Sequence, residues 1–223
     1  MRSALDKGKL NTVYDRLANR YDLQHSFLTA CSDERGRRLV VERAVRWGNS
    51  VLDSGAGTGS TALLAARKTG PAGRITLFDM NVRMLAVAKQ KIAASAHPDQ
   101  FEFRTGDMAD LPFPDNSFDV TLSTYSLCPL HDPAKGALEL YRVVKPGGRI
   151  GIAHSIEPAS SRVKWFAYKV EDLVWHFPSI SMGCRAVSLL PAPENAGGRV
   201  IFKKSLGVPL WPFVVFVVEK PAP

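Results

Sequence analysis

The chain has 223 residues, of which 45% are hydrophobic, and a formal net charge of +8. This length suits one domain with its own core. No apolar run approaches the roughly 20 residues that cross a bilayer, and the first residues lack the apolar stretch of a secretion signal. The three cysteines are widely spaced and form neither a disulfide framework nor a zinc pattern. We therefore expect a cytoplasmic protein without a metal site.

The positive charge lies on the flanks of the chain. Residues 50–154 carry 11 basic and 10 acidic side chains, whereas residues 1–49 carry 10 and 6 and residues 155–223 carry 8 and 5. Basic flanks favour contact with an anionic membrane, or are simply a solvated surface. The chain lacks interleaved aromatic and basic residues, so we expect no nucleic-acid partner.

Hydrophobic periodicity predicts alternating helices and strands. Residues 8–46 look helical, with one apolar stripe from Leu10 to Tyr21 and a second helix from Ser32 to Trp47. Strands are expected over 50–53, 74–79, 101–104, 118–123 and 149–153, and helices over 60–68, 82–95, 133–144 and 160–176. Irregular chain over 178–197 and two β-rich runs, 199–204 and 212–219, follow. This order predicts an α/β fold: a Rossmann-like sheet of seven mostly parallel strands, one of them antiparallel, with helices on both faces.

The most specific motif follows the first predicted strand. Asp53 precedes glycines at positions 55, 57 and 59, and the next apolar run ends in Asp79. Strand, glycine turn, helix, strand and acid form the layout of a nucleoside-binding unit, in which the acid accepts hydrogen bonds from a ribose. A dinucleotide fingerprint would place its third glycine where this chain has Ser60, and Asp53 would repel a pyrophosphate. The pattern favours an amino-bearing nucleoside ligand.

The D-x-G-x-G-x-G pattern resembles motif I of the S-adenosylmethionine (SAM) methyltransferases. Residues 79–87, 106–119 and 139–148 resemble blocks of the UbiE/MenG family of ubiquinone and menaquinone C-methyltransferases, and residues 13–22 are similar to that family's opening block. The likeness covers residues 11–155. It implies a SAM-dependent methyltransferase acting on a lipophilic small molecule, either a quinone precursor or a phospholipid headgroup.

Two departures leave the acceptor open. Quinone enzymes of this type carry an arginine where this chain has Cys128, and the last third of the chain lacks their pattern. The stretch 128–133 looks more like phospholipid N-methyltransferases and alkyl-thiol methyltransferases. A non-catalytic SAM-binding protein is one alternative, and a nucleotide-dependent oxidoreductase is another.

The resemblance assigns the site residues by motif position. Asp53 would lie near the methionine amino group, Asp79 would accept both ribose hydroxyls, and Asp107 would meet the adenine amino group. The other expected cofactor contacts are Tyr21, Gly55, Gly57, Gly59, Met80, Met108, Ser123 and Thr124. A carbon or hydroxyl acceptor also needs a base, and the catalytic candidates are His131, His154 and Tyr125. Each histidine has a plain structural role as its alternative.

We expect residues 1–223 to form a single methyltransferase domain with four segments. These are an N-terminal helical lid (1–48), a SAM-binding core (49–155), a substrate cap (156–198) and a C-terminal β-hairpin (199–223). The cap is aromatic between residues 165 and 177, which is typical of an apolar acceptor pocket or of plain core packing. With the basic flanks, it predicts transient docking on an anionic membrane.

Overall fold

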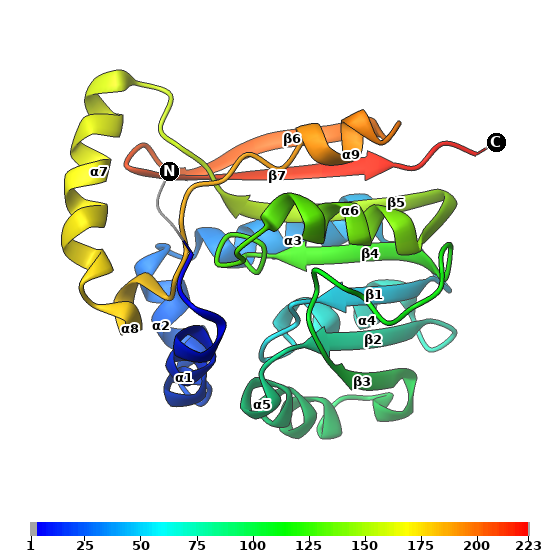
Figure 1. Cartoon of the computed structure of the whole chain (residues 1–223). Coiled ribbons are helices and arrows are strands. Elements are labelled where there is room, and N and C mark those ends of the chain that lie inside the picture. The colour runs from blue at the N-terminus through cyan, green and yellow to red at the C-terminus, as the bar shows by residue number, and fades with distance from the viewer. Residues whose placement is uncertain (1–3, 223) are drawn as a thin grey trace.

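The computed structural model describes residues 4–222, and its centre is a seven-stranded sheet (Figure 1). The strand order is β3-β2-β1-β4-β5-β7-β6. The bounds are β1 Ser50–Ser54, β2 Arg74–Asp79, β3 Phe101–Thr105, β4 Phe118–Thr124, β5 Val144–Ser155, β6 Arg199–Val208 and β7 Trp211–Glu219. β7 pairs antiparallel with both neighbours, and the other pairs are parallel. The predicted sheet with one antiparallel strand is confirmed.

Helices cover both faces of the sheet. They are α1 Lys7–Leu17, α2 Tyr21–Leu28, α3 Ser32–Ala44, α4 Ser60–Thr69, α5 Val82–Ala93, α6 Pro133–Val143, α7 Ser161–Trp175, α8 Pro178–Ser181 and α9 Pro191–Asn195, with a 3-10 turn η1 at Pro98–Gln100. Alternate strand residues face opposite ways. Val51 and Leu77 pack with α3, α4 and α5, whereas Leu52 and Phe78 pack on the side of α6 and α9. All four are fully buried, which is why these strands are continuous apolar runs in the sequence.

The strand order reverses at β1, because β2 and then β3 lie on one side of it and β4 lies on the other. Open α/β sheets bind their ligands beyond the carboxyl ends of the strands at such a reversal. In Figure 1, α1, α2, α7 and α8 stand beside that edge of the sheet. The segments predicted as lid and cap therefore lie on the side where a ligand would bind.

The N-terminal segment contains three helices where the sequence predicts two. The Asp6 carboxylate caps α1 by accepting from the amide of Gly8 at 2.9 Å. The predicted stripe does not run through one helix, because α1 ends at Leu17 and Tyr21 begins α2. Between them the Arg20 amide donates to the Leu17 carbonyl at 2.9 Å, which closes a turn.

Other boundaries also differ from prediction. α3 ends at Ala44 rather than Trp47 because Val45 is extended, with φ −89° and ψ 140°. β5 begins at Val144, which pairs with Phe118 before an irregularity in the ladder. The stretch predicted as irregular contains the short helices α8 and α9.

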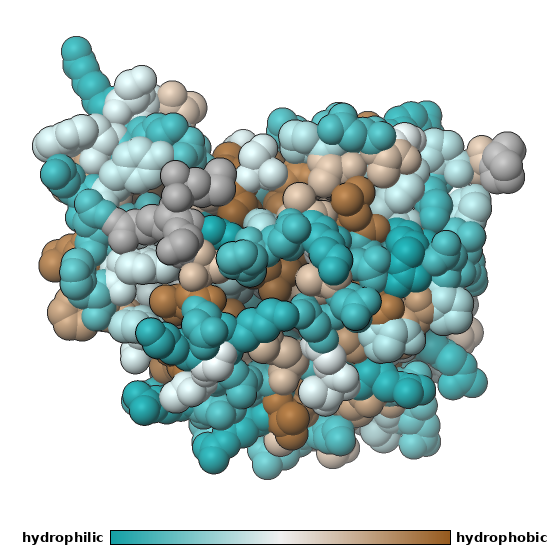
Figure 2. Space-filling view, viewed as in Figure 1, coloured by the Kyte–Doolittle hydropathy of each residue, from teal (hydrophilic) through white to brown (hydrophobic). Residues whose placement is uncertain are grey.

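The cap exposes apolar side chains. α7 has no buried residue along its length. The large exposed apolar side chains on α2, on α7 and just after it are Leu23, Phe27, Leu28, Trp165, Phe166, Leu173 and Phe177. In Figure 2, brown side chains reach the surface at the left edge, where α7 and α8 lie. No helix within residues 4–222 is long and apolar enough to cross a membrane.

Candidate active site

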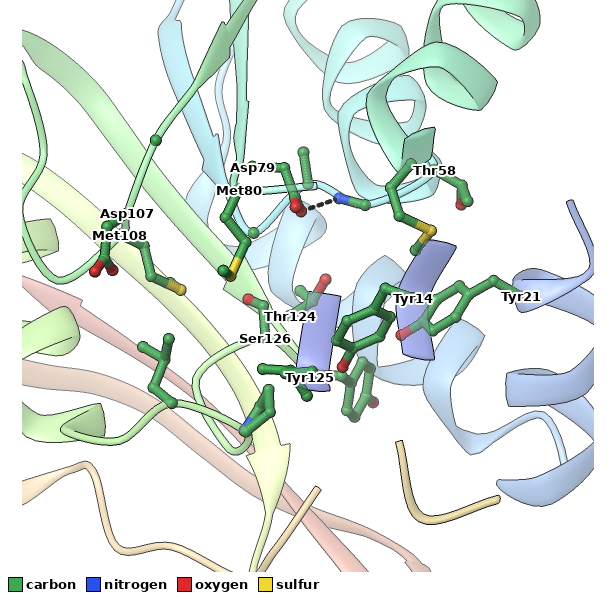
Figure 3. A pocket seen from close by; sticks show the side chains of 18 of the residues that line it. Tyr14, Tyr21, Thr58, Asp79, Met80, Asp107, Met108, Thr124, Tyr125 and Ser126 are labelled. Carbon is green, nitrogen blue, oxygen red and sulfur yellow. Dashed lines mark hydrogen bonds between the residues drawn. The ribbon is translucent and has the colours of Figure 1, made fainter. Parts of the chain in front are cut away.

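A cavity of about 710 Å³, open to solvent, lies at the reversal of the strand order. Its walls are residues 55–58 after β1, 79–80 at the end of β2, 106–108 after β3 and 124–126 at the end of β4. Tyr14 of α1 and Tyr21 of α2 also line it (Figure 3), as do Leu10, Arg37, Met84, Pro129 and Leu130. We call it the first cavity.

The glycine turn needs its glycines for conformation and for space. Gly55 and Gly57 have φ of +71° and +53°, a region that side chains disfavour. A Cβ on Gly55 would lie 2.2 Å from the Cβ of Ser126, so only glycine lets the turns after β1 and β4 meet. The Gly55 amide donates to the Phe78 carbonyl at 2.7 Å, which ties the turn to β2.

Three of the predicted contacts do not line the first cavity: Gly59, Ser123 and Asp53, the last of which is described below. Gly59 begins α4, and a Cβ there would lie 3.1 Å from Ala88 and 3.3 Å from Leu77, so this glycine serves helix packing. The hydroxyl of Ser123 lies 2.6 Å from the Ser126 hydroxyl. Ser123 thus supports the cavity wall from behind.

Asp79 is held as a fixed acceptor in the wall. Its Oδ2 accepts from the Gly57 amide at 2.8 Å (dashed in Figure 3), and its Oδ1 accepts from the Asn81 amide at 2.8 Å. Burial raises the pKa of the Asp79 carboxyl, and the hydrogen bonds from the backbone amides oppose this effect. Each oxygen accepts one of these hydrogen bonds and retains acceptor capacity, so the carboxylate can still accept from ligand hydroxyls.

Asp53 lies behind the glycine turn, 1% exposed, and does not line the first cavity. Within residues 4–222, neither of its carboxylate oxygens has a hydrogen-bond partner. Burial raises the pKa of Asp53 to about 7, against the opposing charge of Arg37. A buried carboxylate without partners is unfavourable when ionised, and a nearby cationic ligand group would relieve that cost.

Met80, Asp107 and Met108 form one end of the first cavity (Figure 3). The Asp107 carboxylate accepts from the Ala109 amide at 2.9 Å and forms an ion pair with Lys7 of α1. That ion pair connects α1 to the turn after β3. Two methionine side chains beside a carboxylate suit a flat ring that carries an amino group.

The other end is formed by residues 124–126 and by Arg37 of α3. Arg37 is buried, and its Nη1 donates to the hydroxyls of Thr124 at 3.0 Å and Thr61 at 3.2 Å. Tyr125 has φ +61°, a conformation that costs a non-glycine residue of order 1 kcal/mol. The strained backbone of Tyr125 makes this end of the cavity a candidate functional site.

Tyr14 and Tyr21 cover the first cavity from the lid. The Tyr14 hydroxyl donates to the Met182 carbonyl at 3.1 Å, so α1 is joined to the cap. Tyr21, the predicted lid contact, stacks on His25 with 5.3 Å between ring centroids. Burial raises the pKa of both tyrosines, so both are neutral.

The three predicted bases occupy very different places. Tyr125 lines the first cavity, but its hydroxyl points to the Ser32 carbonyl at 3.4 Å and burial raises its pKa. His131 is exposed and lines neither this cavity nor the one described next. His154 faces the α6 side, where its ring packs on Phe216 and burial lowers its pKa to about 4. Neither histidine therefore meets the end of the first cavity at residues 124–126.

A second cavity, of about 560 Å³, lies beside the first, and Tyr125 lines both. Most of its lining is apolar and comes from α2, from the end of α7 through residue 184, and from β7. His25, Thr29, Ser155 and Ser181 are its polar contributors.

Sequence reasoning missed Arg37, Tyr14 and Ser126, which all line the first cavity. Arg37 stands among other arginines on α3, and nothing in its spacing distinguishes it from them. Ser126 had a usable signal, since it follows β4 at the carboxyl edge of the sheet.

Comparison with known proteins agrees with this architecture. Among solved structures, the [4+2]-cyclase SpnF superposes with a TM-score of 0.75 at 19% identity over 99% of both chains. A geranyl diphosphate methyltransferase in complex with SAM superposes with a TM-score of 0.68 at 13% identity over 86% of both chains. These likenesses show a shared fold, and a cyclase among them illustrates that the fold alone does not fix the chemistry.

Two curated methyltransferases have a higher sequence identity to this chain than these solved structures do. UbiE from Hahella chejuensis is 33% identical over 149 residues, or 66% of this chain and 60% of that protein. The demethylmenaquinone methyltransferase of Symbiobacterium thermophilum is 32% identical over 154 residues, or 69% of this chain and 61% of that protein. The chain thus matches about three-fifths of the length of these relatives. The ubiE/COQ5 methyltransferase family matches residues 2–180, which confirms the resemblance, and the chain belongs to that family.

Proposed function

We propose that the protein transfers the methyl group of SAM to a lipophilic acceptor of the quinone-precursor class. The observation that carries the proposal is the first cavity, where two backbone amides fix Asp79 beside a glycine turn. A carboxylate held in this way can accept both hydroxyls of a ribose. The acceptor class comes from the curated relatives, which are named for ubiquinone, menaquinone and demethylmenaquinone methylation. Asp53 behind the turn disfavours the pyrophosphate of a dinucleotide-dependent oxidoreductase.

The residues present fit SAM at both ends. Asp53 would compensate the ammonium group, and the buried cation of Arg37 would compensate the carboxylate. Met80 and Met108 would pack on adenine, with Asp107 at its amino group. Bound SAM supplies a methyl group already activated on a sulfonium. The protein therefore has to supply mainly proximity and orientation.

The acceptor ring would occupy the second cavity. Its largely apolar lining suits a lipophilic ring, and Tyr125 is a wall common to both cavities. Cys128, which replaces the arginine of the quinone enzymes, lines neither cavity. An ethanolamine lipid headgroup is thus the competing acceptor, and the assay below distinguishes the two.

An anionic membrane surface would be the partner that delivers this acceptor. Leu28 of α2, Val174 of α7 and Ile180 of α8 line the second cavity. On the same elements Phe27 and Leu173 are 84% and 66% exposed. Because the cavity and the exposed apolar side chains share these helices, a lipophilic molecule could pass from a bilayer into the cavity. The net positive flanks would add electrostatic attraction.

The decisive experiment is mass spectrometry of lipid extracts incubated with the protein and trideuteromethyl-labelled SAM. Labelled quinone precursor supports the proposal, and labelled ethanolamine lipid moves the activity to the headgroup. Asp79→Asn should abolish the product, whereas Asp99→Asn, at an exposed acid, should not. Binding of S-adenosylhomocysteine without any labelled product would instead indicate a non-catalytic SAM-binding protein.

Membrane docking is tested by sedimentation with vesicles of phosphatidylglycerol and phosphatidylcholine. The protein should sediment with the anionic vesicles at low salt and less so at high salt. Phe27→Asn should reduce binding, and Ile201→Asn, on the exposed surface of β6, should not. Absence of binding at every salt concentration would contradict the docking proposal.

A further inference from the structure

His25, in the wall of the second cavity, forms a buried pair with the Asp33 carboxylate that the sequence did not indicate. His25 lies on α2 and Asp33 lies in the first turn of α3. The turn between them passes through Ala30 and Cys31, both with positive φ, and brings Nδ1 of His25 to 2.9 Å from Oδ2 of Asp33. Thr29 donates to the other carboxylate oxygen at 2.9 Å. Both members of the pair are at least 95% buried.

The pair fixes the tautomer of the imidazole. Burial alone would raise the pKa of Asp33. The hydrogen bond from His25, the charge of Arg37 and the hydrogen bond from Thr29 outweigh burial and lower this pKa to about 2, so Asp33 is a carboxylate. A carboxylate only accepts, and Nδ1 of His25 must therefore carry its proton. Nε2 then has its lone pair available, and the hydrogen bond of the His25 ring within residues 4–222 is the one at Nδ1.

The ring is also fixed in position. It stacks on Tyr21 at 5.3 Å and 21°, and it meets Tyr125 at 5.3 Å and 57°. Tyr21 lines the first cavity, Tyr125 lines both, and His25 lines the second. The imidazole therefore stands where the two cavities adjoin, whereas His131 and His154 do not.

We propose that His25, oriented by Asp33, is the general base that takes the hydroxyl proton from a phenolic or enolic acceptor in the second cavity. This inference rests on the proposed function, because it needs an acceptor whose carbon becomes nucleophilic on ionisation. The O–H bond breaks and its proton moves to Nε2. The freed electron pair makes the ring carbon the nucleophile, a C–C bond forms to the methyl group, and the S–CH₃ electron pair stays on sulfur. The ring C–H proton then passes to water, and His25 returns its proton to the oxygen.

The charged and titratable groups around His25 are consistent with this role. Asp33, Arg37 and Asp22 act on it through their charges, and neutral Tyr21 and Tyr125 flank it. Burial lowers the pKa of His25, the Asp33 carboxylate opposes that effect, and the Arg37 charge adds to it. The imidazole is thus neutral near pH 7, as a base must be before the reaction.

The first test measures proton abstraction without the methyl donor. The probe is 2-hexyl-4-nitrophenol, whose absorbance reports its own ionisation. Bound to the wild-type protein, the probe should ionise at a lower pH than in water, and His25→Gln should reverse that shift. His97→Gln, at an exposed histidine, serves as the control. A bound probe that ionises alike in wild type and His25→Gln would overturn the proposal.

The second test uses turnover. His25→Gln should lower kcat by about 100-fold or more, the range for loss of a general base, while the affinity for S-adenosylhomocysteine changes by less than about threefold. Retained affinity also shows that the variant is folded. Asp33→Asn should lower kcat and move the acid limb of the pH profile to lower pH, because the carboxylate raises the pKa of His25. A merely structural pair would leave that limb in place.

The two proposals fail in different ways. If the wild-type protein methylates no lipid, the proposed function fails, and the nitrophenol measurement still reports on His25. If the wild type is active and His25→Gln matches it in kcat and pH profile, the function stands and the role of His25 is refuted.

Discussion

Asp53→Asn is expected to stabilise the ligand-free protein while weakening its ligand binding. The Asp53 carboxyl is 1% exposed and has no hydrogen-bond partner within residues 4–222. Burial raises its pKa from 3.8 to about 7, so the folded state holds the proton more tightly than the unfolded state. At about 1.4 kcal/mol per tenfold change in proton affinity, the folded protein loses about 4 kcal/mol when Asp53 ionises.

The sign of the pH dependence follows from that shift. Between pH 3.8 and about 7 the folded state binds more protons than the unfolded state, so stability falls as pH rises through this window and levels off above it. About 3 kcal/mol of the loss lies between pH 5 and pH 8. Asn cannot ionise, and the variant should lack this component. The Asp53→Asn protein is therefore expected to be the more stable of the two at pH 8.

Urea denaturation at pH 5 and pH 8 measures the effect. Subtracting the curve of Asp53→Asn from that of the wild type removes the contributions of all other titrating groups, and exposed Asp99→Asn should parallel the wild type. Calorimetry should find that the affinity of the wild-type protein for S-adenosylhomocysteine rises between pH 5.5 and 7. The reason is that only ionised Asp53 can compensate the charge of the ligand's ammonium group. Parallel denaturation profiles for the wild type and Asp53→Asn would refute the assignment of a raised pKa.

The remaining predictions concern the cavity walls. Asp79→Asn should weaken S-adenosylhomocysteine binding by about 10- to 100-fold in calorimetry, because an amide can no longer accept from two backbone amides and a ribose, and each lost charged hydrogen bond is worth about 1.5–3 kcal/mol; unchanged affinity would refute its role. Gly55→Ala should cost about 2–5 kcal/mol of unfolding free energy, from a left-handed residue and from contact with Ser126. Gly147→Ala, with φ +75° and open space, should cost only about 1–2 kcal/mol, and equal losses would contradict this account. The hydrogen bond to Cys184 and burial raise the pKa of the Cys128 thiol. Cys128 should therefore resist iodoacetamide at pH 8 until the protein unfolds, whereas the exposed Cys31 should react.

The cofactor half of the site could be predicted because it is encoded locally. The glycine turn and Asp79 lie within 25 residues of each other, and parallel strand pairing alone brings them to one edge of the sheet. Asp107 follows the next strand and reaches the same edge for the same reason. Gly59, Ser123 and Asp53 do not line the first cavity, because a motif position does not distinguish a residue in the cavity wall from one that packs behind it.

The second cavity could not be predicted, since its side chains come from segments that only tertiary packing brings together. The predicted single helix through Tyr21 would point His25 in a different direction from the one that the break between Leu17 and Tyr21 gives it. The apolar residues of the second cavity have the same composition as a core, and periodicity cannot tell the two apart.

Comparison of motifs alone does not show which side chain replaces the arginine of the quinone enzymes, as the position of Cys128 illustrates. In this chain the position that holds an arginine in the quinone enzymes is fully buried on the α6 side of the sheet. Its carbonyl and that of Leu130 instead accept hydrogen bonds from the guanidinium of Arg185, which joins this loop to the cap. The quinone enzymes have a positively charged arginine side chain on the loop after β4. In this chain the positive charge near that loop belongs to Arg185, whose guanidinium donates to backbone carbonyls. Under the proposed function, recognition of the acceptor would depend on other groups, among them His25, which lines the second cavity and is paired with Asp33.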